Sequence, residues 1–373
     1  MTRGLWPPPT TRWFPSLSGA LAVLAVLPAL GCATLGLTEK DPMRAELRRL
    51  EKEQRAKAVQ EQLVDDAKQR EREKHPDTVE GLIARGDANL AKGQVASALW
   101  DYAGAYELDP NAALPRERIG YVHLRHQPER AQPLFESALE RAPDSVNGHI
   151  GLGLSLLAGG NRDEGLRHLQ RAVELDPKSP KAQAALGVSL DQLGRREEAV
   201  AHLEAARNLR PHDSRILNNL GVAYLRSGQP ERAEPLLRAA LREDQRDVPL
   251  RQNNLGMALA MQGRFDEALE AFRGAGDEQS ALSNLGYAHY ARGEYDQAIA
   301  QYEKALLAGG QANVEVVGNL QAARRARDLA RRAPGEAPPV AGAPPPTPAP
   351  RIDPGAIADE DSPVSPPASG APN

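Results

Sequence analysis

Four asparagines in the C-terminal half of this 373-residue chain recur at nearly regular intervals. They are Asn219, Asn254, Asn284 and Asn319, and the spacings between them are 35, 30 and 35 residues. A side-chain amide has both donors and an acceptor, so it can satisfy the C=O and the N–H of a peptide unit together. A row of amides on one surface would therefore hold an extended polypeptide by its backbone, with little demand on its sequence.

The residue patterns that mark common catalytic sites are absent from the sequence. It has no phosphate-binding Gly-rich loop after a strand, no H-E-x-x-H or C-x-x-C pair, and no nucleophilic serine elbow. Its eight histidines are scattered, and its single cysteine excludes zinc sites built on several thiolates. The tripeptide His75-Pro76-Asp77 occurs in J-domain co-chaperones, but the segment before it lacks the apolar face that a J-domain helix buries. We therefore expect a protein that is not an enzyme and that needs neither a cofactor nor a metal.

A longer pattern indicates which elements would position the asparagines. A glycine recurs at intervals of 34, 33, 34, 34, 35 and 30 residues. These marker glycines are Gly86, Gly120, Gly153, Gly187, Gly221, Gly256 and Gly286. A nearly constant period of this size is typical of a solenoid, in which each unit buries its apolar face only against its neighbours. Apolar residues three and four apart predict two helices in each unit.

The fourth unit shows the physical logic of this pattern. Gly187 and Ala199 are small where its two helices are expected to cross, and Gly194 ends the first helix, where a left-handed residue costs least as glycine. Pro211 follows the second helix and cannot continue it. The units resemble the tetratricopeptide repeat (TPR) family, whose 34-residue pattern has small and apolar residues at these offsets. The resemblance covers about residues 79–311.

The resemblance implies an all-α fold, a right-handed superhelical solenoid of about seven helix-turn-helix repeats over residues 79–312. Residues 313–333 read as one further helix with a basic face, which would cap the C-terminal end of the solenoid. Two units depart from the regular pattern. The second is one residue short between its helices, with Gln127-Pro128 at the turn, and the sixth spans only 30 residues. The second helix of the sixth unit must therefore end early, near residues 274–276.

In the TPR family the first helix of each unit lines the concave groove, and one groove-facing site lies two residues before the marker glycine. The resemblance thus places the first three asparagines in the groove of the last three repeats, and Asn319 at the matching site of the capping helix. In the second repeat this site holds Arg118, which could read charge. Adaptable apolar contacts for client side chains would come from Val222, Met257, Tyr287 and Tyr290. The alternative is that asparagine has a structural role here and bonds to neighbouring helices.

Residues 1–31 read as a bacterial secretory signal peptide, with two arginines followed by an uncharged apolar stretch. The stretch closes in Ala-Leu-Gly-Cys, which resembles a lipobox and predicts that Cys32 becomes the lipidated N-terminus. Residues 32–38 would then tether the protein to a bilayer. The alternative is an uncleaved membrane anchor, because residues 14–38 carry no charge.

Two further segments flank the repeats. Residues 39–75 are densely charged with a thin apolar stripe, which predicts a long exposed helical linker, with a coiled coil as the alternative. Residues 334–373 contain 13 prolines in 40 residues, which predicts a disordered tail with polyproline II character. Within this tail, the run from Ala343 to Pro350 could dock in an aromatic groove, although a tail of this composition is more often a plain spacer.

These features together predict an extracytoplasmic protein-binding scaffold. The formal net charge of −4 gives no reason to expect a nucleic acid as a partner. The expected partners are a protein client, held as an extended segment in the groove, and the lipid bilayer, reached through acylated Cys32. We expect an outer-membrane lipoprotein facing the periplasm, with an inner-membrane anchor as the alternative. The architecture resembles that of pilus and secretin assembly lipoproteins. A scaffold for peptidoglycan enzymes or outer-membrane protein assembly fits the same residues, and a docking subunit that regulates an enzyme is a further alternative.

Overall fold

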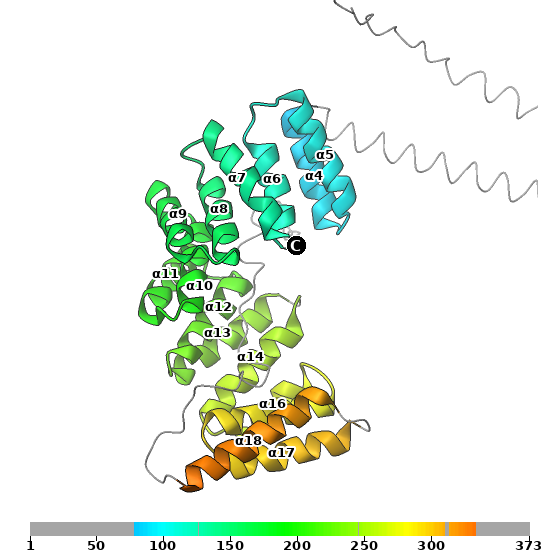
Figure 1. The fold of residues 1–373 in the computed structure, drawn as a ribbon, viewed down its shortest axis with the longest axis vertical. Coiled ribbons are helices and arrows are strands. Elements are labelled where there is room, and N and C mark those ends of the chain that lie inside the picture. The colour runs from blue at the N-terminus through cyan, green and yellow to red at the C-terminus, as the bar shows by residue number, and fades with distance from the viewer. Residues whose placement is uncertain (1–77, 126, 245, 310–312, 333–373) are drawn as a thin grey trace, which may run out of the picture. The chain divides into compact units, whose positions relative to one another are not determined.

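The computed structural model describes residues 78–125, 127–244, 246–309 and 313–332 (Figure 1). The chain divides after Pro76 into two units, and all the described residues belong to the second. Within the described ranges the chain forms fifteen helices and no strand. The helices pair into seven helix-turn-helix units, followed by a single helix, α18 (Val314–Arg332). The predicted all-α repeat solenoid is therefore confirmed.

Each unit consists of a first and a second helix joined by a short turn. The first helices are α4 (Val79–Ala91), α6 (Leu114–Leu124), α8 (Val146–Ala158), α10 (Pro180–Gln192), α12 (Ser214–Arg226), α14 (Val248–Met261) and α16 (Glu278–Ala291). The second helices are α5 (Val95–Leu108), α7 (Pro128–Arg141), α9 (Arg162–Leu175), α11 (Arg196–Leu209), α13 (Pro230–Glu243), α15 (Phe265–Arg273) and α17 (Tyr295–Ala308).

The helices pack mainly in the order in which the chain visits them. The two helices of a unit share the most extensive contacts, and each second helix then packs against the first helix of the next unit. First helices of successive units also touch one another, from α6 and α8 through to α16 and α18. The surface shared by these first helices and α18 is called the inner face below.

The marker glycine sets the distance between the two helices of a unit. A Cβ atom on Gly187 would lie 2.8 Å from Leu203 Cγ and 3.1 Å from the carbonyl oxygen of Ala199. Leu203 is only 1% exposed, so its side chain has no free space into which it could move. The turn that follows contains Gly194 with a φ of 81°, a left-handed conformation that glycine adopts without strain. The predicted roles of both glycines are confirmed.

The two irregular units have different local structures. In the second unit, α6 ends four residues after Gly120, whereas α10 ends five residues after Gly187. Both turns contain three residues, so the missing residue is lost from the end of α6 and not from the turn. In the sixth unit α15 has nine residues, whereas the other second helices have fourteen, and it ends just before Gly274 as predicted.

The extra residue of the 35-residue interval lies at the start of α14. This helix begins eight residues before Gly256, whereas α12 begins seven residues before Gly221, and the connections before both helices contain four residues. Asp247 has a left-handed backbone with a φ of 52°. Arg251, which is 1% exposed, donates to the carbonyl oxygens of Asp244 at 2.9 Å and Arg246 at 2.6 Å. A buried guanidinium thus satisfies backbone carbonyl groups of this connection, which would otherwise be unpaired.

The basic face of α18 docks on the second helix of the seventh unit. Arg324 pairs with Glu303 at 2.7 Å, and Arg331 pairs with Asp296 at 3.1 Å. Apolar residues on the other face of α18, including Val316 and Leu320, join the core of that unit. Several arginines that could suggest a nucleic-acid site are therefore paired with acidic residues of α17.

The predicted signal peptide (1–31), Cys32 and its tether (32–38), the charged linker (39–75) and the Pro-rich tail (334–373) lie outside the described residues. Among the helices that the structure does describe, none is both long enough and apolar enough to cross a bilayer.

Candidate peptide-binding site

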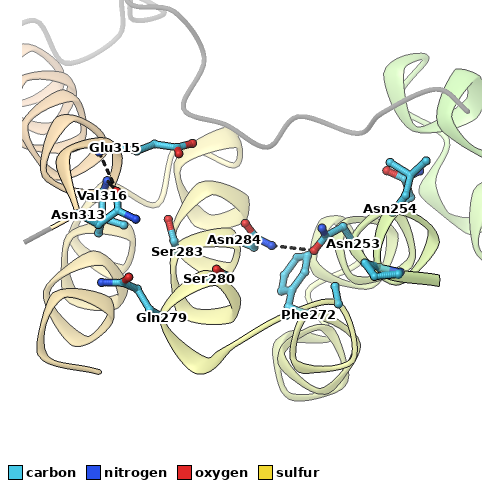
Figure 2. A pocket seen from close by; sticks show the side chains of 14 residues that line it. Asn253, Asn254, Phe272, Gln279, Ser280, Ser283, Asn284, Asn313, Glu315 and Val316 are labelled. Carbon is cyan, nitrogen blue, oxygen red and sulfur yellow. Dashed lines mark hydrogen bonds between the residues drawn. The ribbon is translucent and has the colours of Figure 1, made fainter. Parts of the chain in front are cut away.

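Asparagine side chains link the last three units through hydrogen bonds. Asn254 Nδ2 of α14 donates to Asn218 Oδ1 of α12 at 2.8 Å. Asn218 Nδ2 in turn donates to Asn219 Oδ1 at 3.3 Å. One unit further on, Asn284 Nδ2 of α16 donates to Asn253 Oδ1 of α14 at 2.7 Å (Figure 2). We call these contacts the amide relay, because an amide on one first helix bonds to an amide on the preceding first helix, and Asn218 also bonds to Asn219 within α12.

The predicted asparagines are buried within this relay. The exposed fractions are 1% for Asn219, 1% for Asn254, 5% for Asn284 and 7% for Asn319. Two of them bond to neighbouring helices, which is the structural role that the sequence left open as an alternative. Their contact with a client stays a prediction.

Two asparagines of the relay were not predicted from the sequence. Asn218 and Asn253 stand one residue before the predicted sites and supply the acceptor oxygens for the next unit. The signal was present in the sequence, because the fifth and sixth units both read Asn-Asn-Leu-Gly at this point. A doublet places one amide in the groove-facing site and the other one step around the helix, toward the following unit.

The relay stops at Asn319 of α18. In the repeat register, Ser283 occupies the position from which Asn253 accepts the hydrogen bond of Asn284. A serine side chain is shorter than an asparagine side chain, so the corresponding bond to Asn319 is not formed. Asn319 Nδ2 has no hydrogen-bond partner among the described residues, although Asn319 is only 7% exposed. A buried amide without a partner is uncommon and costs free energy, so the C-terminal end of the relay presents an unused donor.

A polar pocket of about 390 Å³ opens beside this end of the relay. Figure 2 shows it between α14, α16 and the first turn of α18. Its amide and hydroxyl lining consists of Asn253, Asn254, Gln279, Ser280, Ser283, Asn284 and Asn313. Glu315 is the one charged residue of the lining, and Phe272 and Val316 are among the apolar ones. Residues 275 and 276, which follow the shortened α15, form part of the wall, so the irregular sixth unit helps to create the pocket.

The pocket amides are oriented by bonds to the backbone. Asn313 Oδ1 accepts from the backbone N–H of Glu315 at 2.9 Å, as a residue at the start of a helix does. Gln279 Nε2 donates to the carbonyl oxygen of Ala305 at 3.2 Å. Asn313 therefore directs its amide N–H groups away from the helix, while Gln279 retains its oxygen as an acceptor. A neutral ligand with hydrogen-bonding groups suits this lining better than an anion, because no cation is found among the described residues that line the pocket.

The predicted apolar contacts divide into two kinds. Val222 is 0% exposed and Met257 is 4% exposed, so both side chains are buried. Tyr287 and Tyr290 are partly exposed and lie one helical turn apart on α16. Tyr290 also contacts the ring of Tyr295 edge-on, with ring centroids 5.5 Å apart. Burial raises the pKa of the Tyr287 phenol, so this ring stays protonated and can donate a hydrogen bond.

The predicted groove residue Arg118 and two acidic residues of the first two units bond to their neighbours. Arg118 Nε lies 3.1 Å from Asp87 Oδ1 across the boundary between units. Asp87 also accepts a hydrogen bond from Tyr102 Oη at 2.6 Å. Glu117 accepts from Ser145 Oγ at 2.5 Å, at the start of α8. These contacts give the charges a role in holding successive units together.

Two histidines form a contact inside the third unit. His149 Nε2 donates to the carbonyl oxygen of Pro143 at 3.0 Å, which leaves its Nδ1 to accept from His168 Nδ1 at 2.9 Å. Burial lowers the pKa of both imidazoles. Neither belongs to a cluster of three or more His, Cys, Asp or Glu residues, and no such cluster occurs in the described ranges. The contact between these two rings is a packing interaction.

Comparison with known families decides the class of this protein. A family model described as the C-terminal domain of cilia and flagella-associated protein 70, a TPR domain, matches residues 42–284, which is more than half of the chain. The chain belongs to this TPR family. A second model, for the tetratricopeptide repeat itself, matches residues 279–308. The TPR resemblance read from the sequence is thus confirmed.

A solved structure supports the same fold, and two others have lower similarity. The APC/C hetero-tetramer Cut9–Hcn1 is 18% identical with a TM-score of 0.52, over 65% of this chain and 48% of that chain. The TPR protein thus spans about half the length of that chain. YrrB, described as a TPR protein with an unusual peptide-binding site, is 22% identical with a TM-score of 0.40, over 52% of this chain and 98% of its own. PilF of Pseudomonas aeruginosa is 22% identical with a TM-score of 0.45, over 57% of this chain and 96% of its own. None of the curated proteins matches the TPR chain.

Proposed function

We propose that this TPR protein is a lipid-anchored, extracytoplasmic scaffold that holds an extended segment of a client protein on its inner face. TPR proteins are typically non-catalytic scaffolds for protein partners, which sets the general class. The amide relay and the polar pocket at its C-terminal end carry the proposal for this chain. They concentrate hydrogen-bonding side chains on α12, α14, α16 and the first turn of α18.

An extended polypeptide matches this lining chemically. Its backbone presents N–H and C=O groups in alternation, and the pocket offers amides and hydroxyls that serve as donors and acceptors. The pocket has no cation with which to select an acidic ligand, and Glu315 disfavours one. Because the relay asparagines are buried, we expect the client to contact the more exposed pocket residues next to them, such as Asn253 and Ser280.

Site-specific crosslinking in living cells tests this function. A photo-reactive phenylalanine at position 280, which is exposed and lines the pocket, should form an adduct with the client. The matched control is position 231, an exposed site on the second helix α13. Mass spectrometry then locates the crosslinked client segment, which we expect to be extended in the client.

Calorimetry with that segment, made as a peptide, measures the contribution of the pocket. The double variant Asn253→Ala, Ser283→Ala should weaken binding at least tenfold while the far-UV circular dichroism stays unchanged. Equal adducts at both crosslinking positions, or unchanged affinity in the double variant, would contradict the proposed function.

The cellular setting of the proposal comes from the N-terminal sequence. The lipobox-like ending at Cys32 supports an outer-membrane lipoprotein facing the periplasm, and an inner-membrane anchor is the alternative. Assembly of a pilus or secretin is the specific process that this architecture suggests, and the scaffolding of peptidoglycan enzymes or outer-membrane assembly is the competing one. The identity of the client crosslinked at position 280 discriminates between them.

A further inference from the structure

The inner face ends in a strip that combines aromatic rings with unused hydrogen-bond donors. On α16 the strip runs from Ser280 and Ser283 at the pocket to Tyr287 and Tyr290. Residues at these spacings of three and four share one side of a helix. Asn319 Nδ2, buried and without a partner among the described residues, corresponds in register to the relay position next to Ser283.

Aromatic rings beside hydrogen-bond donors are the features that recognise polyproline II segments. Proline rings pack on tyrosine rings, and the preformed helix loses little entropy on binding. A polyproline II segment has no internal hydrogen bonds, and proline has no N–H, so its free carbonyl groups need donors rather than acceptors. The Ser283 hydroxyl and the protonated Tyr287 phenol supply donors of this kind.

We infer that the first occupant of this aromatic strip is the Pro-rich tail of the same chain, and that a client must displace it. The matching segment is Ala343–Pro350, Ala-Pro-Pro-Pro-Thr-Pro-Ala-Pro. The inference rests on the proposed use of the inner face for extended chains, and it adds regulation of that face by the tail.

The length of the chain after α18 allows this contact. The first turn of α18 lines the pocket, and its 19 residues rise by about 28 Å, so the helix ends no more than about that far from the pocket. Residues 333–343 span about 34 Å in polyproline II geometry, which is sufficient to bring Ala343 back to the strip. Arg351 directly follows the proline run, and Glu315 at the pocket rim offers it an opposite charge.

Competition within one chain gives the inference a measurable consequence. A tail joined through a short connection competes at an effective concentration of about 1 mM. If the free segment binds with a Kd of about 100 µM, the attached tail weakens the binding of an added copy about tenfold. The tail thus sets a threshold that a client segment must exceed, either by affinity or by concentration.

A peptide of residues 341–351 labelled with fluorescein is the probe, and fluorescence anisotropy reports its binding to the full chain in detergent. A tail variant of the full chain has five prolines replaced: Pro344→Ala, Pro345→Ala, Pro346→Ala, Pro348→Ala and Pro350→Ala. We expect the tail variant to bind the probe and the unaltered chain to bind it about tenfold more weakly.

Substitutions on the inner face then locate the site in the background of the tail variant. Tyr287→Ala together with Tyr290→Ala should weaken probe binding at least tenfold. Tyr106→Ala is the matched control, since this tyrosine is 41% exposed on α5 of the first unit, and it should leave binding unchanged. Ser283→Asn keeps both tyrosines and removes the Ser283 hydroxyl from the strip, so it should also weaken probe binding without loss of helicity.

Three results would overturn the inference. They are equal probe affinity for the unaltered chain and the tail variant, binding to neither chain, and unchanged binding in a well-folded double tyrosine variant. None of them bears on the crosslinking of a client at position 280, so the proposed function would stand or fall separately.

Discussion

Two glycines in the middle of helices should respond in opposite ways to the same substitution. Gly187 of α10 faces α11 at close range, and an added Cβ would meet Leu203 Cγ at 2.8 Å and a backbone oxygen at 3.1 Å. Gly318 of α18 is exposed, and a Cβ there has no neighbouring atom within 4 Å. The intrinsic gain in helix propensity from Gly→Ala is about 1 kcal/mol at either position. Only packing distinguishes them.

The magnitudes follow from the two environments. Overpacking a buried helix crossing costs about 1–3 kcal/mol, and the gain in propensity offsets part of that. Gly187→Ala should therefore lower the free energy of unfolding by up to about 2 kcal/mol, whereas Gly318→Ala should raise it by about 0.5–1 kcal/mol. With a shift of about 2–4 °C per kcal/mol for a chain of this size, the two melting temperatures should move apart by several degrees.

Thermal and urea unfolding followed by circular dichroism at 222 nm measures both variants. Repeat arrays can unfold in more than one transition. For each variant, the midpoint compared is that of the transition in which the substituted unit unfolds. If Gly187→Ala proved as stable as Gly318→Ala, the helices of a unit would not be held apart by the marker glycine, and this account of the repeat would be refuted.

Three further predictions concern other parts of the chain. Since burial lowers the pKa of His149 and His168, the unfolded state binds more protons below pH 6.5, and stability should fall as the pH drops from 6.5 through the folded pKa values. His149→Gln copies Gln183, which accepts from His202 in the fourth unit, and should reduce this slope in urea titrations at pH 5 and 7 by about half; an equal slope would contradict the assignment. Arg251→Met should lower the free energy of unfolding by about 1–3 kcal/mol, because the carbonyls of Asp244 and Arg246 lose a buried donor. The exposed Arg246→Met on the same loop is its control and should change stability far less. Cys32→Ala should abolish the incorporation of labelled palmitate, and labelling that persists would exclude lipidation at this residue.

Most of the fold could be predicted because each unit is specified within its own sequence. The marker glycines, the apolar spacing and the turn glycine at position 194 all act within about 20 residues of one another. The early end of α15 before Gly274 could be read for the same reason. In the second unit, the missing residue was expected in the turn between the helices but is lost from the end of α6. Sequence spacing shows that one residue is missing after Gly120, but only packing decides whether the helix or the turn loses it.

The candidate site was less accessible from the sequence. The period placed Asn219, Asn254 and Asn284 at equivalent positions, since equal spacing in a solenoid gives equal surroundings. It could not show that these side chains are nearly inaccessible, because burial depends on what the neighbouring units contribute. Val222 and Met257 were expected at the surface and are buried for the same reason.

The sequence by itself thus determined that the chain is a solenoid of TPR units and that amides recur along one of its faces. Both properties depend on short-range spacing, which a helix of 3.6 residues per turn converts directly into position. The tertiary structure decided what the amides contact, since Asn254 and its acceptor Asn218 are 36 residues apart. It also decided that Asn319 Nδ2 lacks a partner among the described residues and that a pocket opens beside Ser283, because both follow from the side chains that a preceding unit brings to the interface.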